Sequence, residues 1–365
     1  MARRICHLTT VHRQEDVRIF HKECVSLANA GYEVYLVSCG ETYDKMGVHI
    51  LGAAKRTGSR LKRMTRSAKA VYKAALGLDA DVYHIHDPEL IPYGVKLKRH
   101  GKKVIFDDHE GLSAQMLEKD WIPTLLRKPA SRIYGAAESH ALKKFDAVVT
   151  ATPYLAEEIK GRCRRVAAVN NYPRLDDVEF HEKPFHERGP IVCYAGGIKE
   201  VRGEKIMTEA MKDVDGTLVI AGDHEIMEIG DKVRYTGHLD RAGVNDLYGS
   251  AVAGLCILMP TKHFYNSQPV KMYEYMAAGL PFVCSDFSGW RKVAEESRCG
   301  ICVDPTDPAA VAKAINTLLC DRELAQEMGR SGYDYVISNC NWANEEKVLL
   351  DLYRQVLESA EDQEM

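Results

Sequence analysis

The sequence predicts an α/β protein made of two doubly wound, Rossmann-like domains. Short apolar runs rich in β-branched residues alternate with amphipathic helical patterns along almost the whole chain. This alternation is typical of parallel sheets that are covered by helices on both faces. The 365 residues are enough for two such cores, because single domains usually contain about 100–200 residues. A polar segment with three prolines, Asn170 to Pro190, divides the series, so we predict an N-terminal domain at 1–172, a linker at 173–189, a C-terminal domain at 190–340 and a final helical segment at 341–365.

Each predicted domain contains six candidate strands. Those of the first half are Ile5–Thr9, Val34–Val37, Val82–Ile85, Lys103–Phe106, Ala147–Thr150 and Val166–Val169, with helical patterns at Val17–Ala30, Ser59–Leu76, Leu90–Arg99 and Pro129–Lys144. Those of the second half are Ile191–Tyr194, Thr217–Ala221, Val233–Tyr235, Gly254–Leu258, Phe282–Cys284 and Gly300–Val303. A last helix is expected from Trp342 to Glu358, with its apolar residues on one side.

Composition and charge restrict the class of protein. No stretch approaches the roughly 20 apolar residues that span a bilayer, and the 11 scattered cysteines fit reduced thiols in a cytoplasmic protein. Residues 1–175 hold 30 Lys and Arg against 19 Asp and Glu, whereas residues 176–365 hold 19 against 33. This asymmetry predicts two domains with different partners, and the basic first domain is expected to have an anionic partner.

The stretch NSQPVKMYEYMAAGLPFVCSD, from Asn266 to Asp286, predicts a helix whose start could bind an anion. Pro269 suits the first turn and Gly279 suits the left-handed end of a helix. Free N–H groups at the start favour a negative ligand, and Lys271 adds a positive charge there. Glu274 lies three residues later on roughly the same face, where a carboxylate could bind hydroxyl groups. An ordinary capped helix with a surface ion pair is the alternative.

Three glycine-containing loops follow expected strands of the second half. They are AGGIKEVRGEK with Gly196, Gly197 and Arg202, GDHE with Gly222 and Asp223, and TGHLD with Gly237 and His238. Ligands of open α/β sheets bind beyond the carboxyl ends of the strands, so these loops are candidates for a nucleotide site, although ordinary turns would look the same. The glycine fingerprint of dinucleotide-binding enzymes is absent, which argues against a nicotinamide or flavin enzyme.

The first half has two strand exits crowded with histidines and carboxylates, HIHDPE and FDDHEG. His84, His86, Asp87 and His109 suggest a metal site, but the spacing matches neither the familiar binuclear hydrolases nor H-E-x-x-H. We therefore expect no metal. His109 beside a substrate is the preferred interpretation, and a structural histidine at a strand end is the alternative.

The stretch from Lys55 to Lys73 has eight Lys and Arg and no acid. Apolar residues at helical spacing from Leu61 to Tyr72 are expected to face the protein core, with Ser59 as the N-cap. The basic face predicts attachment to anionic lipid. Nucleic acid is not expected as a partner, because interleaved aromatic residues and a known reading motif are absent.

Taken together, these motifs resemble the retaining glycosyltransferases of family 4, which have the GT-B fold of two domains facing across a cleft. The resemblance covers nearly the whole chain. The first residues, CHLTTVHRQEDVRIFHKECVSLANAGYEVYLVS, are similar to the branch that builds bacterial surface polysaccharides. The resemblance also implies that the helix beginning at Trp342 crosses back to the first domain.

The resemblance implies a role for each candidate residue. Glu274 would hold ribose hydroxyls, Lys271 and Arg202 would clamp the diphosphate, and His109 would lie beside the transferred sugar. The nucleotide would be lined by Gly196, Gly197, Gly222, Asp223, Gly237, His238, Asn266, Gln268 and Val270. Two departures stand out, since Asn266 replaces the first acid of the family motif and HRQEDVRIF replaces a Gly-Gly loop. The second departure puts His12 or Arg18 on the acceptor side.

The expected activity is a retaining, metal-independent transfer of sugar from a nucleotide-diphosphate sugar to a glycan or lipid-linked saccharide in surface-polysaccharide assembly. No cofactor is expected. The protein would be cytoplasmic and peripheral on the inner face of the plasma membrane. A nucleotide-sugar epimerase or hydrolase of the same fold, and a non-catalytic nucleotide-sugar-binding subunit, are the alternatives.

Overall fold

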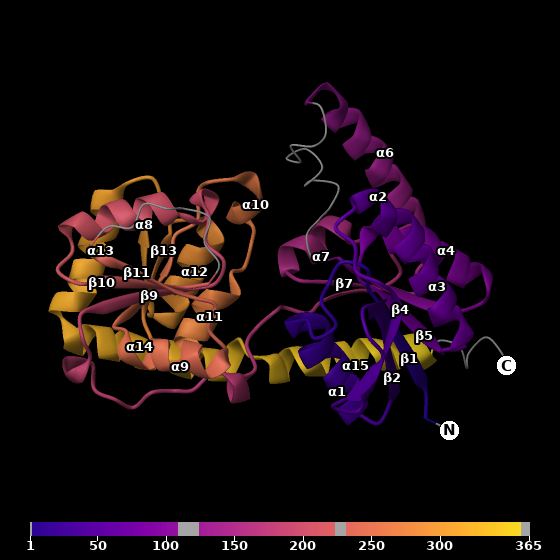
Figure 1. The fold of residues 1–365 in the computed structure, drawn as a ribbon, viewed down its shortest axis with the longest axis horizontal. Helices are drawn as coiled ribbons and strands as arrows, with labels where there is room; N and C mark the ends of the chain where they lie inside the picture. The colour runs from indigo at the N-terminus through magenta and orange to yellow at the C-terminus, as the bar shows by residue number, and fades with distance from the viewer. Residues whose placement is uncertain (1, 109–123, 223–230, 359–365) are drawn as a thin grey trace. The chain divides into compact units, whose positions relative to one another are not determined.

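The computed structural model describes residues 2–108, 124–222 and 231–358, and the chain forms two compact units (Figure 1). The first unit consists of Met1–Asn171 with Ala343–Met365, and the second is Tyr172–Trp342. Both are α/β units with largely parallel sheets, so the predicted fold class is confirmed. No helix in the described part of the chain is long and apolar enough to cross a membrane.

The sheet of the first unit has eight strands in the order β3-β4-β2-β1-β5-β6-β7-β8, and all pairs are parallel except β3 with β4. The strands are β1 (Arg4–Leu8), β2 (Glu33–Cys39), β3 (Tyr43–Lys45), β4 (Val48–Ala54), β5 (Val82–Ile85), β6 (Lys103–Asp108), β7 (Ala147–Thr150) and β8 (Val166–Ala168). The six predicted strands are present with ends that differ by at most two residues. The β3–β4 hairpin was not predicted, because its edge strand is short and polar. Its turn is made by Met46 and Gly47, both at positive φ.

Helices cover both faces of this sheet. They are η1 (Val17–Cys24), α1 (Val25–Asn29), α2 (Arg60–Lys62), η2 (Arg63–Ser67), α3 (Ala68–Gly77), η3 (Pro88–Leu90), α4 (Ile91–Arg99), α6 (Thr124–Leu142), α7 (Pro153–Ile159) and α15 (Trp342–Glu358). Alternate residues of a strand point to opposite faces. Cys6 and Leu8 of β1 therefore pack in a core with α3 and α4, whereas His7 faces η1 and α15.

Three predicted helices of this unit differ in detail from the structure. The predicted helices 17–30 and 59–76 both contain a π-helical stretch, η1 and η2, which periodicity alone does not distinguish from an α-helix. Ser59 is an N-cap as predicted and accepts a hydrogen bond from the Lys62 amide. The helix predicted to begin at Pro129 begins at Thr124, with Pro129 inside it. A proline removes one intrahelical hydrogen bond, and the bonded turns on both sides let the helix continue.

The second unit has a six-stranded parallel sheet in the order β11-β10-β9-β12-β13-β14. The strands are β9 (Ile191–Ala195), β10 (Thr217–Ala221), β11 (Val233–Gly237), β12 (Ala253–Cys256), β13 (Phe282–Ser285) and β14 (Gly300–Val303). The helices are η4 (Leu175–Asp177), η5 (Phe185–Glu187), η6 (Glu200–Arg202), α8 (Glu204–Ala210), η7 (Met211–Asp213), α9 (Arg241–Ser250), α10 (Lys262–Tyr265), α11 (Val270–Ala277), α12 (Ser288–Ser297), α13 (Pro308–Cys320) and α14 (Arg322–Asn339). In Figure 1, α8 and α13 lie on one side of this sheet, and α9, α11 and α14 lie on the other.

The segment predicted as a linker, 173–189, belongs to the second unit. Val178 and Phe185 are buried in its core, and the Arg188 guanidinium lies 3.9 Å from the Phe185 ring centroid. Arg188 also donates hydrogen bonds to the carbonyls of His181 and Ala251. The prediction of a linker was wrong here, because it relied on the lack of a repeating apolar pattern. Two isolated apolar side chains and one arginine are enough to hold the segment against the second unit.

The helix α15 has the bounds that the sequence indicates, and from Ala343 onward it belongs to the first unit. The Lys103 ammonium donates to the carbonyls of Val356 and Leu357 at 2.5 and 2.7 Å. Asn170 donates its backbone and side-chain N–H groups to the Glu345 carboxylate at 2.7 and 3.0 Å. These bonds satisfy polar groups at both ends of the helix.

Candidate functional site

Three glycine turns lie side by side at the carboxyl edge of β9, β10 and β11. They contain Gly196, Gly222 and Gly237, which all have positive φ. The Gly196 amide donates to the Ala221 carbonyl at 2.7 Å, and the Gly222 amide donates to the Gly237 carbonyl at 2.8 Å. These bonds continue the sheet ladder into the loops, so that backbone without side chains lines the strand ends.

The contact between two of these turns requires glycine. A methyl group on Gly222 would lie 2.3 Å from the Gly196 carbonyl oxygen, and Gly222 has φ +144°. We expect Gly222→Ala to destabilise the protein by more than about 1 kcal/mol and to weaken nucleoside diphosphate binding at least about tenfold. Thermal denaturation and calorimetric titration would measure both effects.

Gly289→Ala in α12 is the matched control for this substitution. Its methyl group would meet no atom within 4 Å, so it should not lower the melting temperature and should leave nucleotide affinity unchanged. Equal behaviour of the two variants would contradict the close approach described here.

Lys271, in the first turn of α11, points toward the first glycine turn. Its ammonium donates to the Tyr194 hydroxyl at 3.0 Å and lies 4.1 Å from the centroid of that ring. The Lys271 ammonium is also 3.5 Å from the position that a Cβ atom on residue 196 would occupy. A mobile cation beside the start of a helix and a bare backbone turn is suited to binding a phosphate.

Arg202, at the end of η6, lies on the same turn. One guanidinium nitrogen donates to the Gly197 carbonyl at 2.7 Å, and the side chain is exposed. The Tyr194 hydroxyl donates to the same carbonyl at 3.2 Å. Tyr194 therefore joins the two cations, a role that sequence reasoning missed because this buried tyrosine resembles any other core residue of a strand.

Glu274 lies one turn along α11 and has both carboxylate oxygens bonded. Arg241 donates to one oxygen at 2.9 Å, and the Tyr248 hydroxyl donates to the other at 3.2 Å. Burial first, and the Glu274 carboxylate second, raise the pKa of Tyr248 well above its usual range, so that its hydroxyl stays protonated. Arg241 and Tyr248 were not predicted, because each is a single residue of α9 and no motif in that helix marks it as part of a site.

The other predicted nucleotide-lining residues lie on and before α11 or beyond β11. Asn266 is exposed at the end of α10, Val270 is the first residue of α11, and His238 is exposed after β11. The Gln268 side-chain oxygen is buried and has no hydrogen-bond partner among the described residues. His109 and Asp223 lie outside the described residues.

His12 lies between two carboxylates in the loop after β1. Its Nδ1 is 3.4 Å from Asp16, and its Nε2 is 3.6 Å from Asp87. Asp87 accepts hydrogen bonds from Thr9 and from the Thr10 and Val11 amides, which fix this loop. Burial opposes the charged form of His12, but the hydrogen bond with Asp16 and the charge of Asp87 outweigh it and raise the His12 pKa.

We expect Asp16→Asn to lower the His12 pKa, which a proton NMR titration would measure with His12→Gln as the assignment control. The His12 pKa is raised in the folded protein, so its contribution to stability is present below about pH 6.5 and is lost as the pH rises through the raised value. The lowered Asp16 pKa adds stability that is lost only in acid. An unchanged His12 pKa in Asp16→Asn would contradict this pairing.

Arg18 does not lie on an open surface. Its guanidinium makes two bonds of 3.1 Å to the Asp107 carboxylate, one of 2.7 Å to the Val169 carbonyl, and a 3.1 Å contact with Glu23. The residue is 6% exposed. Arg18 was predicted to contact an acceptor, and the structure corrects this. Its guanidinium is bonded to groups inside the first unit.

The fold closely matches those of solved structures that share little sequence with this chain. Sucrose-phosphate synthase from Thermosynechococcus elongatus superposes with a TM-score of 0.80 at 17% identity, over 98% of this chain and 100% of that one. Anabaena HepE, solved in complex with UDP-glucose, superposes with a TM-score of 0.71 at 11% identity, over 96% and 99% of the two chains. At these identities the likeness shows the fold alone.

Sequence comparison decides the family. A model of glycosyltransferase family 4 matches residues 17–171, and a model of glycosyl transferases group 1 matches residues 176–335. Alpha-maltose-1-phosphate synthase of Mycolicibacterium smegmatis is 34% identical over 85% of this chain and 90% of its own length. The chain belongs to the GT-B glycosyltransferases. Other relatives are matched over less of their length, 66% of alpha-D-kanosaminyltransferase from Streptomyces kanamyceticus and 48% of spore coat protein SA from Bacillus subtilis, at 25% and 26% identity.

The basic stretch of this glycosyltransferase, Lys55 to Lys73, is only partly as predicted. Ala68 and Val71 are buried, but Leu61 and Met64 are 73% and 47% exposed. The expectation that all the apolar residues face the core was wrong for the first turns, because α2 has no buried residue and η2 buries only Ser67. Arg63 is paired with Glu89 at 2.7 Å, which reduces the free positive charge.

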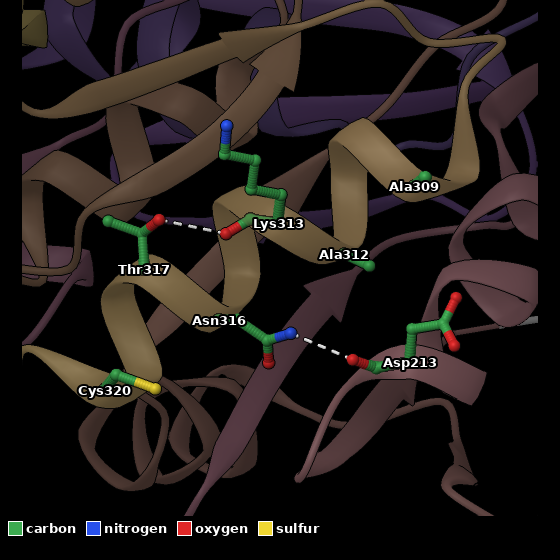
Figure 2. Close-up of a pocket in the computed structure, with 7 residues that line it drawn as sticks. All are labelled: Asp213, Ala309, Ala312, Lys313, Asn316, Thr317 and Cys320. Carbon is green, nitrogen blue, oxygen red and sulfur yellow. Dashed lines mark hydrogen bonds between the residues drawn. The ribbon is translucent and has the colours of Figure 1, made fainter.

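A hollow on the second unit shares no residue with the glycine turns. Figure 2 shows it between α13 and η7, lined by residues that include Asp213, Lys313 and Cys320. The Asn316 side chain donates to the Asp213 carbonyl at 2.9 Å, and the lining offers one ammonium group without a second cation. It therefore lacks the paired cations that a diphosphate requires.

Proposed function

We propose that this glycosyltransferase transfers a sugar, with retention of configuration, from a nucleotide-diphosphate sugar to a glycan or lipid-linked saccharide of a surface polysaccharide. The observation that carries the proposal is the convergence of Lys271 and Arg202 on the Gly196–Gly197 turn. A diphosphate is the ligand chemistry that two cations, a helix start and a bare backbone turn suit best. HepE was solved in complex with UDP-glucose, and a nucleotide-diphosphate sugar as donor for this chain agrees with that ligand.

The proposed step breaks the bond between the sugar's anomeric carbon and the diphosphate oxygen. The electron pair leaves with the nucleoside diphosphate, and the acceptor oxygen bonds to the anomeric carbon on the face that the leaving group vacates. The departing phosphate takes the acceptor's proton. Lys271 and Arg202 stabilise the charge that develops on the leaving diphosphate, which is a larger effect in the transition state than in the ground state. We propose no metal in this step.

Glu274 is proposed to bind the ribose hydroxyls of the donor. Its carboxylate is held by Arg241 and Tyr248, so its orientation is fixed before a nucleotide arrives. A fixed acceptor of hydrogen bonds costs less entropy on binding than a mobile one.

A thermal-shift panel of UDP, GDP, dTDP, ADP and CMP tests the donor class. A ligand at 100 times its Kd stabilises the folded protein by about 2.7 kcal/mol, so one or more nucleoside diphosphates should raise the melting temperature while CMP should not. Lys271→Ala should reduce the shift without abolishing it, because this contact strengthens mainly as the bond to the sugar breaks. No shift with any nucleoside diphosphate would contradict the proposed site.

Asn266 favours one alternative, a nucleotide-sugar-binding subunit without turnover, because an amide stands where the resemblance places an acid. Measuring sugar transfer with a panel of lipid-linked and free saccharides distinguishes the two proposals. Tight donor binding with no transfer and no donor hydrolysis would support the binding subunit. Full-rate donor consumption without acceptor would instead indicate the epimerase or hydrolase class.

We also propose that the basic stretch binds the protein to anionic membranes. Exposed Leu61 and Met64 stand among exposed cations, and this combination suits the boundary between headgroups and acyl chains. Neutralising Arg60, Lys62 and Arg66 should weaken cosedimentation with phosphatidylserine vesicles by about 100-fold, since each cation near the surface contributes about 1 kcal/mol. Neutralising Lys212, Lys292 and Lys313 of the second unit is the control. Equal binding by both variants would contradict this surface.

A further inference from the structure

Three imidazoles and one carboxylate meet in the interior of the first unit. His7 comes from β1, His84 and His86 come from β5 and the residue after it, and Glu23 comes from η1. Each offers one ligand atom, and the four atoms lie within 4.8 Å of one another. All four residues are at most 2% exposed.

The backbone brings these groups together. His7 and His84 are directly paired across parallel β1 and β5, so their side chains leave the same face of the sheet. The His86 amide donates to the Leu8 carbonyl at 3.1 Å, which extends the ladder and keeps His86 on the face of His84. The wider turn of the π-helix η1 directs Glu23 toward this face.

The Glu23 carboxylate is the unusual member. Its Oε2 lies 4.0 Å from His7 Nδ1, 3.8 Å from His84 Nδ1 and 3.9 Å from His86 Nε2. These separations are too long for hydrogen bonds, and Oε2 has no hydrogen-bond partner among the described residues. A buried carboxylate oxygen that faces three imidazoles without bonding to any of them leaves room for an atom between them.

We propose that His7, His84, His86 and Glu23 bind a divalent transition-metal ion of the zinc type. Imidazole and carboxylate are ligands that Zn²⁺ accepts, and ligand distances near 2.1 Å in a tetrahedron place ligand atoms about 3.4 Å apart. The three contacts of Glu23 and the 2.8 Å separation of His7 Nδ1 from His86 Nε2 bracket that value. The ion would replace the proton that joins the two imidazoles.

Groups around the cluster would orient these ligands. The Tyr353 hydroxyl of α15 lies 3.1 Å from His7 Nε2, the nitrogen of His7 that is not used for the metal. It also lies 2.8 Å from His84 Nδ1, and the ion would displace that hydrogen bond. Asp107 lies 3.4 Å from His86 Nδ1. Hydrogen bonds on the far side of a metal-bound histidine fix its ring and raise its basicity. The ion would join β1, β5, η1 and α15, and it takes no part in the proposed sugar transfer.

Elemental analysis of the full chain, purified without a metal-affinity step, tests the proposal. We expect about one ion per chain, retained through dialysis, and a fall in the melting temperature when a chelator removes it. Cobalt substitution should give visible absorption bands typical of four-coordinate nitrogen and oxygen ligation. His49→Ala, which removes an exposed histidine paired with Asp44, should leave the metal content unchanged.

Two ligand variants and one neighbouring variant complete the test. His7→Ala and the isosteric Glu23→Gln should lose most of the metal, and Tyr353→Phe should retain it with about 10–100-fold lower affinity. If His7→Ala does not fold, the metal content of Glu23→Gln and the cobalt spectrum of the wild type still test the proposal. Metal content below about one tenth of an ion per chain, with no rise in melting temperature on adding Zn²⁺ or Co²⁺, would overturn the proposal. Equal metal content in Glu23→Gln and the wild type would also overturn it.

Discussion

Replacing Lys271 by alanine is expected to lower kcat by about 10²–10³-fold while changing KM much less. The ammonium lies beside the Gly196 turn, where the proposed reaction develops negative charge on the leaving diphosphate. An interaction that strengthens as the bond to the sugar breaks contributes to the rate rather than to ground-state binding. Steady-state kinetics with a donor identified by the nucleotide panel would measure the change.

Lys313→Ala is the matched control, because this exposed lysine lines the hollow of Figure 2 and lies on α13. It should leave kcat and KM as in the wild type. Arg202→Ala should lower kcat in the same sense as Lys271→Ala. Unchanged kcat in both Lys271→Ala and Arg202→Ala would rule out their proposed roles, even if nucleotide binding persisted.

Replacing Arg18 by methionine is expected to destabilise the first unit by about 3–5 kcal/mol. The substitution keeps much of the side-chain volume but leaves the buried Asp107 carboxylate without its two guanidinium bonds. For a unit of this size about 1 kcal/mol corresponds to roughly 2–4 °C, so thermal denaturation should show a shift on the order of 10 °C.

The exposed pair of Arg291 with Asp286 supplies the control. Arg291→Met should not change the melting temperature measurably, because exposed ion pairs contribute little. Replacing both partners, Arg18→Met with Asp107→Leu, should recover part of the loss, since it removes the unpaired buried charge. A double variant less stable than Arg18→Met would show that Asp107 is stabilised by other groups.

Much of the fold was predictable because local patterns and long-range structure agree. Buried parallel strands such as Ala147–Thr150 and Thr217–Ala221 are nearly continuous apolar runs, and the structure has them with those bounds. The β3–β4 hairpin was not predicted, and the segment at 173–189 was predicted to be a linker and not a part of the second unit. Both depend on contacts made by a few separated residues, such as Phe185, which no local period records.

The candidate nucleotide site was predictable in its glycines and in its cations, because the topology requires ligands beyond the carboxyl ends of strands. Its supporting residues were not. Arg241, Tyr248 and Tyr194 reach Glu274 and Lys271 from other elements, and only the fold reveals that they meet. Arg18 shows the converse, since its residue type suggested contact with an acceptor while its burial assigns it to the interior.

The return of α15 to the first unit sets an order for biosynthesis. A ribosome produces the strands of the first unit early, but the helix that bonds to Lys103 and Asn170 emerges only after the whole second unit has been made. The nascent first unit must wait with the part of its sheet that α15 covers still exposed, which makes this interval the time when chaperones would be needed most. The second unit is continuous in sequence, so it depends on no segment that is made after it.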